Sequence, residues 1–203
     1  MSSVRIKRGI DIVVSLFLLV ALTPVFLVVS VLVLAALGWP IFFVQSRAGL
    51  RGKIFQLIKF RSMRDGRPNE SDRERLTSFG RCLRRLSLDE LPELIHVLRG
   101  EMSLVGPRPL MAEYLHLYSP AQSRRHDVRP GITGWAQIHG RNTLSWEDRF
   151  DLDVWYVDHW NLWIDFKILC LTAVHVVKQS GISATNHETM PKFTGENRER
   201  ANG

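Results

Sequence analysis

The sequence predicts a mainly α-helical chain with one small β-hairpin, attached to a membrane at its N-terminal end. Three observations predict this class. An uncharged apolar run covers residues 12–37, two β-rich segments lie between residues 41 and 60, and apolar residues recur at helical spacing in the second half of the chain. We therefore expect a membrane segment at residues 1–38 and one further domain at residues 39–203, which together act as a single functional unit.

The apolar run is long enough to cross a bilayer, which takes roughly 20 residues. Thr23-Pro24 lies in its middle, where the proline removes a helix hydrogen bond and kinks the helix. Basic residues flank both ends of the run: Arg5, Lys7, Arg8, Arg47, Arg51 and Lys53. Positive charge normally marks the cytoplasmic side, so equal charge at both ends gives no orientation. The residues alone leave two alternatives open, a spanning helix and a re-entrant helix that returns to the same side.

The composition limits the class of protein and of partner. A length of 203 residues suits one domain, and a net charge of +7 favours anionic partners such as nucleic acid, acidic lipids or phosphorylated substrates. Cys82 and Cys170 stand alone, so no disulfide framework is expected. The seven histidines lack the spacing of a zinc site, which argues against a zinc protein.

The predicted hairpin follows the apolar run. Residues 41–45 and 53–60 are rich in β-branched and aromatic side chains, and Gly49 and Gly52 stand between them, which is typical of two strands joined by a turn. Residues 64–71 are polar and contain glycine and proline, so we expect a loop there.

Three later segments have helical apolar spacing, at residues 88–98, 146–160 and 162–178. The last is too polar to cross a bilayer but fits an amphipathic helix that lies at the membrane interface. An ordinary core helix is the alternative. Five of the six tryptophans fall between residues 135 and 163, and such clusters also suit the interface.

Two adjacent carboxylates, Asp89 and Glu90, stand at the expected start of the helix at residues 88–98. One interpretation is structural, because Ser87 and Glu90 fit a capping box and Asp89 is an alternative cap. The other is functional, because the positive end of the helix and the nearby Arg84 favour an ionised carboxylate. Such a group can attack phosphorus, and a second carboxylate beside it can hold Mg²⁺.

Arginines in stiff turns fit phosphate chemistry. Arg108 lies between Pro107 and Pro109, which restrict the backbone and so fix where the guanidinium points. Arg129 and Arg141 stand in two further turns that contain glycine. Because arginine binds phosphate in a planar, bidentate manner, these residues indicate a phosphate-binding site.

At these residues the chain resembles a known family, the bacterial sugar transferases, also called monotopic phosphoglycosyl transferases. The matching blocks keep the family's order between residues 6 and 180. They are KFRSM (59–63), LSLDELPEL (86–94), MSLVGPRP (102–109), RPGITGWAQIHGRN (129–142) and DVWYVDHWNLWIDFKIL (153–169). The length is similar to that of the family's minimal form. His139 stands where the family's pattern has Asn, a departure in a loop expected to contact the sugar or the base.

The resemblance implies a reaction. A sugar 1-phosphate passes from a UDP-sugar donor to a polyprenyl phosphate such as undecaprenyl phosphate, and UMP is released. It also implies Mg²⁺ as cofactor, a place among the lipids of the bacterial inner membrane with the catalytic domain on the cytoplasmic face, and no nucleic-acid partner. The chain is also a candidate homo-oligomer.

The resemblance implies roles for individual residues. Asp89 is expected to be the nucleophile of a covalent phosphosugar intermediate, Glu90 to bind Mg²⁺ with it, and Arg108 to contact phosphate. Further substrate-binding positions are implied: Lys59, Arg84, Pro107, Pro109, Arg141 and Asp165. The resemblance also favours the re-entrant alternative, because the family's membrane helix breaks at a polar residue and proline, as at Thr23-Pro24.

An alternative from another class is a membrane-tethered basic binding module without catalysis. It accounts for the charge and the membrane segment, but not for the carboxylate pair or the Pro-Arg-Pro turn. The tail at residues 180–193 is a candidate cover over the nucleotide-sugar.

Overall fold

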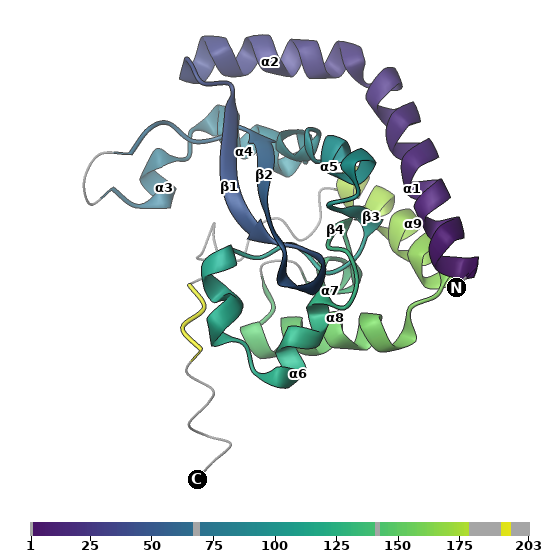
Figure 1. The fold of residues 1–203 in the computed structure, drawn as a ribbon. Coiled ribbons are helices and arrows are strands. Elements are labelled where there is room, and N and C mark those ends of the chain that lie inside the picture. Colours follow the sequence, from purple (N-terminus) through teal and green to yellow (C-terminus); the bar gives the residue numbers. More distant parts are fainter. Residues whose placement is uncertain (1, 67–69, 141–142, 179–191, 196–203) are drawn as a thin grey trace.

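The computed structural model describes residues 2–66, 70–140, 143–178 and 192–195. Helices dominate and an antiparallel hairpin lies among them (Figure 1), which confirms the mainly helical class with a small hairpin. The elements, with 3₁₀ helices written as η, are α1 (Ser2–Ala21), α2 (Thr23–Leu37), β1 (Phe42–Ala48), η1 (Leu50–Gly52), β2 (Ile54–Phe60), α3 (Asp72–Arg75), α4 (Ser78–Arg85), η2 (Leu88–Glu90), α5 (Glu93–Arg99), β3 (Ser103–Val105), η3 (Ala112–Leu117), α6 (Pro120–Ser123), η4 (Arg124–His126), β4 (Gly131–Thr133), α7 (Trp135–His139), α8 (Trp146–His159) and α9 (Leu162–Lys178).

The apolar run forms two helices, α1 and α2, bent by 62° at the predicted break. Pro24 lies in the first turn of α2, where its missing N–H costs little, and the Thr23 hydroxyl donates to the carbonyl of Leu19 at 2.8 Å. Among the described residues, no single helix is both long and apolar enough to cross a membrane, whereas the bent pair passes that test of length and composition as a unit.

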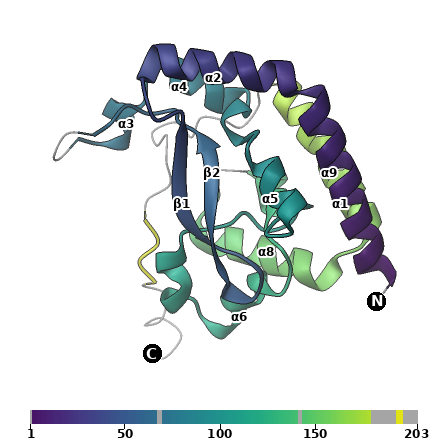
Figure 2. The ribbon, with the colours of Figure 1, turned by 45° about the horizontal axis from the view of Figure 1, so that its top comes forward.

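Polar side chains attach the first half of α1 to the rest of the protein. Lys7 donates to the carbonyl of Val105 at 3.1 Å, Arg8 donates to two carbonyls at the end of α5, and Asp11 accepts from a backbone amide of β3. Figures 1 and 2 show α1 running beside α9 while α2 passes over the hairpin. Two of the basic residues before the apolar run are therefore protein contacts, which is a second reason why flanking charge gave no orientation.

The hairpin pairs β1 with β2 in antiparallel register, from Phe42 opposite Phe60 to Ala48 opposite Ile54. Gly49 and Gly52 bracket the turn as predicted, and Gly52 has a positive φ of 72°. The first strand extends three residues past its predicted end, because the amide of Ala48 also bonds the carbonyl of Leu110 at 3.0 Å.

A second, parallel strand pair was not predicted. β3 and β4 have three residues each and pair in parallel, with Ser103 opposite Gly131 and Val105 opposite Thr133. They fit together because glycines let the backbones approach: a Cβ on Gly131 would lie 2.0 Å from the amide nitrogen of Gly106. This crossing holds the Pro-Arg-Pro turn that follows β3.

The main core lies between the hairpin, α5, β3, α8 and α9. The predicted helices at residues 146–160 and 162–178 are confirmed as α8 and α9. Ile168 of α9 is fully buried, so the helix contributes to the core, and Trp163 and Phe166 on it are exposed. Its place at a membrane interface stays a prediction.

Candidate active site

The carboxylate pair lies on a short 3₁₀ turn, η2, that precedes the helix. The predicted helix at residues 88–98 is therefore shorter than expected: α5 begins only at Glu93, with Pro92 as its N-cap. The capping interpretation is wrong, because Ser87 adopts a left-handed conformation (φ 54°) and its side chain makes no capping hydrogen bond. The turn instead lets both Asp89 and Glu90 line a cavity.

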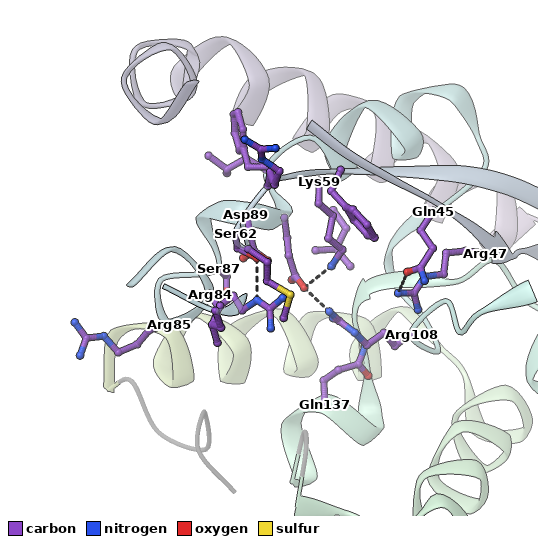
Figure 3. A pocket seen from close by; sticks show the side chains of 18 of the residues that line it. Gln45, Arg47, Lys59, Ser62, Arg84, Arg85, Ser87, Asp89, Arg108 and Gln137 are labelled. Carbon is purple, nitrogen blue, oxygen red and sulfur yellow. Dashed lines mark hydrogen bonds and ion pairs between the residues drawn. The ribbon is translucent and has the colours of Figure 1, made fainter. Parts of the chain in front are cut away.

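This cavity has a volume of about 1470 Å³ and is strongly cationic. Among the described residues, ten lysines and arginines line it against six aspartates and glutamates. Five of the predicted site residues lie on its wall together: Lys59, Arg84, Asp89, Glu90 and Arg108. Figure 3 shows Lys59, Arg84, Asp89 and Arg108 around the cavity. A wall with this balance of charge favours an anionic ligand.

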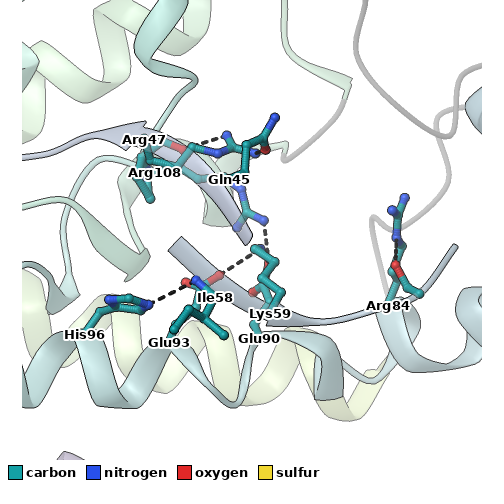
Figure 4. A network of polar contacts seen from close by, with 11 residues as sticks. Gln45, Arg47, Ile58, Lys59, Arg84, Glu90, Glu93, His96 and Arg108 are labelled. Atoms are coloured by element: carbon teal, nitrogen blue, oxygen red, sulfur yellow. Dashed lines mark hydrogen bonds and ion pairs between the residues drawn. The ribbon is translucent and has the colours of Figure 1, made fainter. Parts of the chain in front are cut away.

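Glu90 is held in place by two cations. Lys59 Nζ lies 2.9 Å from Glu90 Oε1 and 2.7 Å from Glu93 Oε1, and Arg108 Nη2 bonds the same oxygen of Glu90 (Figure 4). Glu93 is 1 % exposed and was not singled out from the sequence. Its place one helical turn beyond Asp89 and Glu90 was the only available signal.

His96 positions the strand that carries Lys59. The amide of Ile58 donates to His96 Nε2 at 3.0 Å, so this nitrogen must be unprotonated. The other ring nitrogen, Nδ1, lies 2.6 Å from a carboxylate oxygen of Glu101 and carries the proton. Figure 4 shows this histidine on α5 reaching the backbone of β2 directly before Lys59.

Asp89 differs from Glu90 in its surroundings. It is 8 % exposed, and no described side chain or amide donates a hydrogen bond to its carboxylate. Burial and the neighbouring charge of Glu90 raise its pKa, while Lys59 and Arg84 lower it less strongly. Asp89 precedes α5 instead of starting it, so the predicted helix end does not lie at this carboxylate. Arg84 bonds Ser62 Oγ through Nε at 2.9 Å, and its charge lowers the pKa of Asp89, in the predicted direction.

The pKa of Glu90 moves in the opposite direction. Burial alone would raise it, but Arg108 and Lys59 together hold the pKa of Glu90 well below its usual range. In return, Glu90 raises the pKa of Arg108. The pair is thus one firmly ionised carboxylate beside one that is buried, unbonded and directed at the cavity.

Three hydrogen bonds fix the backbone of the Pro-Arg-Pro turn. The carbonyl of Pro107 accepts from the first amide of β4 at 3.0 Å, that of Arg108 from Arg125 Nη2 at 2.8 Å, and that of Pro109 from Arg47 Nη1 at 3.0 Å. With these carbonyls bonded to the protein, the Arg108 side chain points into the cavity. The expectation that this turn orients its arginine is supported, although Pro107 and Pro109 lie behind the cavity wall rather than on it.

Arg125 itself belongs to a buried ion pair that the sequence did not reveal. Its guanidinium bonds Asp153 Oδ2 through Nε at 3.1 Å and Nη2 at 2.6 Å, and both residues are 2 % exposed or less. The two lie 28 positions apart, so no local pattern could have marked them.

Asp165 lies elsewhere, in a second buried cluster. Its carboxylate accepts from Tyr156 at 2.6 Å and from Trp160 at 3.0 Å, and it pairs with Lys7 of α1. The structure does not bring Asp165 together with Asp89 on the cavity wall. Arg141, also implied as substrate-binding, falls outside the described residues, as do residues 180–191 of the tail.

The donor set of the cavity fits a hard divalent cation only in part. Among the described residues there is no group of three or more His, Cys, Asp or Glu side chains placed to hold a metal. Asp89 and Glu90 nevertheless offer two adjacent carboxylates on one wall. Because Mg²⁺ is commonly held by one or two carboxylates together with substrate phosphates, these residues fit such a site.

Comparison with known proteins places this geometry in a family. The sequence profile of the family described as "Bacterial sugar transferase" matches residues 2–179. The chain is 52% identical over 194 residues to the "Uncharacterized sugar transferase EpsL" of Bacillus subtilis, covering 94% of this chain and 96% of the relative. It is 38% identical over 196 residues to the "Exopolysaccharide production protein ExoY" of Sinorhizobium fredii, covering 86% and 87%.

Longer relatives match as well. The "Undecaprenyl-phosphate glucose phosphotransferase" of Komagataeibacter xylinus is 42% identical over 184 residues, which cover 82% of this chain and 35% of the relative. The chain thus spans about a third of that protein and nearly the whole length of the two shorter ones. From the profile match and these identities, the chain belongs to the bacterial sugar transferase family.

Proposed function

We propose that this protein transfers a sugar 1-phosphate from a UDP-sugar to undecaprenyl phosphate, releasing UMP, as the first membrane step in the assembly of a glycoconjugate such as an exopolysaccharide or capsule. Relatives named as undecaprenyl-phosphate glucose and galactose phosphotransferases support this reaction class. The observation that carries the proposal is Asp89, a buried carboxylate that accepts no hydrogen bond from the described residues and faces a cation-lined cavity.

The chemistry proceeds in two displacements. A carboxylate oxygen of Asp89 attacks the phosphorus bonded to the sugar, and the bond from that phosphorus to the bridging oxygen breaks, so UMP leaves with that oxygen. An oxygen of polyprenyl phosphate then attacks the same phosphorus. The aspartyl–phosphorus bond breaks, Asp89 is regenerated, and the product is a polyprenyl diphosphate sugar.

The cations around Asp89 and Glu90 make the first attack feasible, although the carboxylate and the donor diphosphate are both anions. The hydrogen bond from Arg125 to the Arg108 carbonyl and the bond of Arg108 to Glu90 fix this arginine. Its guanidinium lies beside Asp89, where it can bind the donor phosphates. Lys59 and Arg84 lower the pKa of Asp89 against burial, and so favour its nucleophilic form. Asp89 and Glu90 are the residues that would hold Mg²⁺, which supplies further neutralisation of phosphate oxygens when bound.

The same proposal includes the membrane. We infer that α1 and α2 enter one leaflet as a re-entrant pair and return at the bend, which leaves the catalytic domain on the cytoplasmic face of the inner membrane. Support comes from the 62° bend and from the apolar side chains exposed along both helices, among them Phe17, Val20, Leu27 and Val31. The polar contacts of Lys7, Arg8 and Asp11 keep the start of α1 on the protein rather than across a bilayer.

The membrane proposal is tested by labelling a cysteine placed near Met1. In the native chain this end should be accessible from the cytoplasmic side only. Pro24→Leu should restore a helix hydrogen bond and let the pair straighten. If this end of the native chain is labelled from the outside, the re-entrant arrangement is wrong.

The catalytic proposal is tested by a panel of UDP-sugars assayed for UMP release with polyprenyl phosphate and Mg²⁺. One or more donors should yield UMP, whereas a basic binding module would yield none. Incubation with the active donor alone, followed by mass spectrometry of peptides, should find the phosphosugar on the peptide that contains Asp89. Turnover without any such adduct would refute the covalent step but not the overall transfer.

A further inference from the structure

The C-terminal segment at residues 192–195 is seated against the protein. Phe193 is 8 % exposed and packs into a cluster of aromatic rings, with centroid distances of 5.8 Å to both Tyr114 and Tyr118, 5.4 Å to Trp146 and 5.1 Å to Phe150. Figure 1 shows the segment in yellow beside the helical turns of η3. A ring in contact with four others is an anchor, because its removal would expose apolar surface on all of them.

Gly195 provides a second point of attachment. It has a positive φ of 76°, and a Cβ there would lie 3.2 Å from the Cβ of Leu117, so a side chain would crowd η3. The segment is thus fitted to η3 on both sides of the exposed Thr194.

The anchor and the cavity share a wall. Tyr114 and Trp146 contact Phe193 and also line the active-site cavity, and Lys192 lines that cavity as well. Arg149, which lies over the Trp146 ring at 5.5 Å, is on the same part of the wall. A cation therefore reaches the cavity from a segment that is distant in sequence from every block of the Asp89 site.

The position of this wall indicates which substrate it meets. The acceptor is a lipid and must come from the side of α1 and α2, where Leu18 of α1 and Leu22 at the bend line the cavity. Figures 1 and 2 both show residues 192–195 on the other side of the molecule from the α1–α2 bend. The wall also combines aromatic rings with cations, which suits a nucleotide because bases stack on aromatic rings and phosphates bind cations.

We propose that Lys192 binds the nucleotide half of the UDP-sugar donor, and that Phe193 holds the C-terminal segment in place for this contact. The inference rests on the proposed function for the identity of the donor. It adds a donor-binding residue and a structural role for a segment outside the family match, which ends at residue 179.

The first test compares substitutions at Lys192. Lys192→Ala should raise the KM for the UDP-sugar about tenfold, since a charge-assisted hydrogen bond is lost, with kcat and the KM for polyprenyl phosphate unchanged. Lys192→Arg should restore most of the affinity. Thr194→Ala, on the exposed neighbour, is the matched control and should behave as the native protein.

The second test removes the anchor. A chain that ends at Pro191 should show the same rise in KM for the donor, whereas a chain that ends at Gly195 keeps the seated segment and should match the native protein. Phe193→Ala should resemble the shorter chain, and Phe193→Trp should retain more of the native affinity. Thermal unfolding of each variant reports whether an effect on KM comes from loss of fold.

The outcomes separate this inference from the proposed function. Native protein that releases no UMP from any donor would refute the proposed function, and calorimetric binding of UDP to the native and Lys192→Ala proteins would still test the lysine. An active native enzyme with an unchanged donor KM in Lys192→Ala overturns the inference. A rise in the KM for polyprenyl phosphate instead of the donor overturns it too.

Discussion

Two buried aspartates, Asp89 and Asp165, share many features and have different surroundings. Asp89 is 8 % exposed and Asp165 is 7 % exposed. Each lies near a lysine, Lys59 for Asp89 and Lys7 for Asp165. Both oxygens of Asp165 are occupied, one by Tyr156 and the other by Trp160 and Lys7. Asp89 accepts no hydrogen bond from the described residues and lines the cavity.

The difference shows that burial and nearby charge do not by themselves mark a reactive carboxylate. The cluster around Asp165 joins α1 to α8 and α9, so the hydrogen bonds to both of its oxygens serve attachment. At the site around Asp89, the cations Lys59 and Arg108 donate their hydrogen bonds to Glu90 and not to Asp89. A nucleophile needs unbonded oxygens in a field that favours its anion, and only Asp89 of the two has them.

The strongest test of this contrast is Asp89→Asn against Asp165→Asn. Asp89→Asn should lower turnover by at least about 10³-fold, because an amide cannot form the covalent intermediate. Its thermal midpoint should stay equal to or above the native value, since the substitution removes a carboxylate that faces Glu90. UMP release and circular dichroism measure the two effects. Native-like turnover in Asp89→Asn would contradict the nucleophile assignment.

Local patterns in the sequence were sufficient for the parts of the site that depend on neighbours in the chain. The dyad at Asp89 and Glu90 and the arginine of the Pro-Arg-Pro turn could be chosen from adjacent residues, and the structure places them together on one cavity. The hairpin could be predicted because each strand is seven residues long and a glycine turn separates them.

Features that depend on distant contacts could not be predicted. β3 and β4 are too short for a periodic signal and exist because Gly106 and Gly131 let two backbones meet. The capping prediction failed because Ser87 adopts a left-handed conformation that no residue type at that position demands. The support of Arg108 by Arg125 joins residues 17 positions apart and became visible only in three dimensions.

A second test asks whether the buried ion pair of Arg125 and Asp153 affects catalysis at Asp89. Arg125→Ala should lower kcat/KM by about 10²-fold, because the Arg108 carbonyl loses its donor and a misplaced catalytic group is costly. It should also destabilise the fold by about 3 kcal/mol, since Asp153 is left buried without its partner. Arg124→Ala, which breaks only an exposed pair with Asp158, is the control.

The double variant Arg125→Met, Asp153→Leu separates positioning from stability. Replacing a buried ion pair with apolar residues often restores stability, so the thermal midpoint should recover. The carbonyl of Arg108 still lacks its donor, so activity should stay low. Recovery of both quantities would mean that Arg125 acts on stability alone.

A third test applies to the hydrogen-bonded cluster around Asp165. Asp165→Asn should destabilise the protein by about 3 kcal/mol, because Lys7 and the Tyr156 hydroxyl lose a buried anionic partner. The kcat of the folded protein should remain within about threefold of the native value, because Asp165 lies off the cavity wall. Unfolding midpoints and UMP release measure these effects. A large loss of kcat with native stability would support the substrate-binding role implied by the family resemblance.

The smallest expected effect is a shift in the pH profile, and it tests why Asp89 stays reactive. Activity requires the ionised carboxylate, and burial and Glu90 raise the pKa of Asp89 above its usual value of 3.8. The rate should therefore fall, as the pH is lowered, through an acid limb that lies above pH 3.8. Arg84 lowers the pKa of Asp89, so Arg84→Gln should move this limb to higher pH, measured as kcat/KM at constant Mg²⁺.

Arg85→Gln is the matched control for this shift. Figure 3 shows Arg85 directed away from Asp89, although both arginines line the cavity and the two substitutions remove the same charge. If the limb moves equally in both variants, the effect comes from the overall charge of the cavity. If it moves to lower pH in Arg84→Gln, the limb does not report Asp89. A shift confined to Arg84→Gln would place the titrating group beside that guanidinium. Asp89, which accepts no hydrogen bond from the described residues, lies there, whereas the fully bonded Asp165 does not.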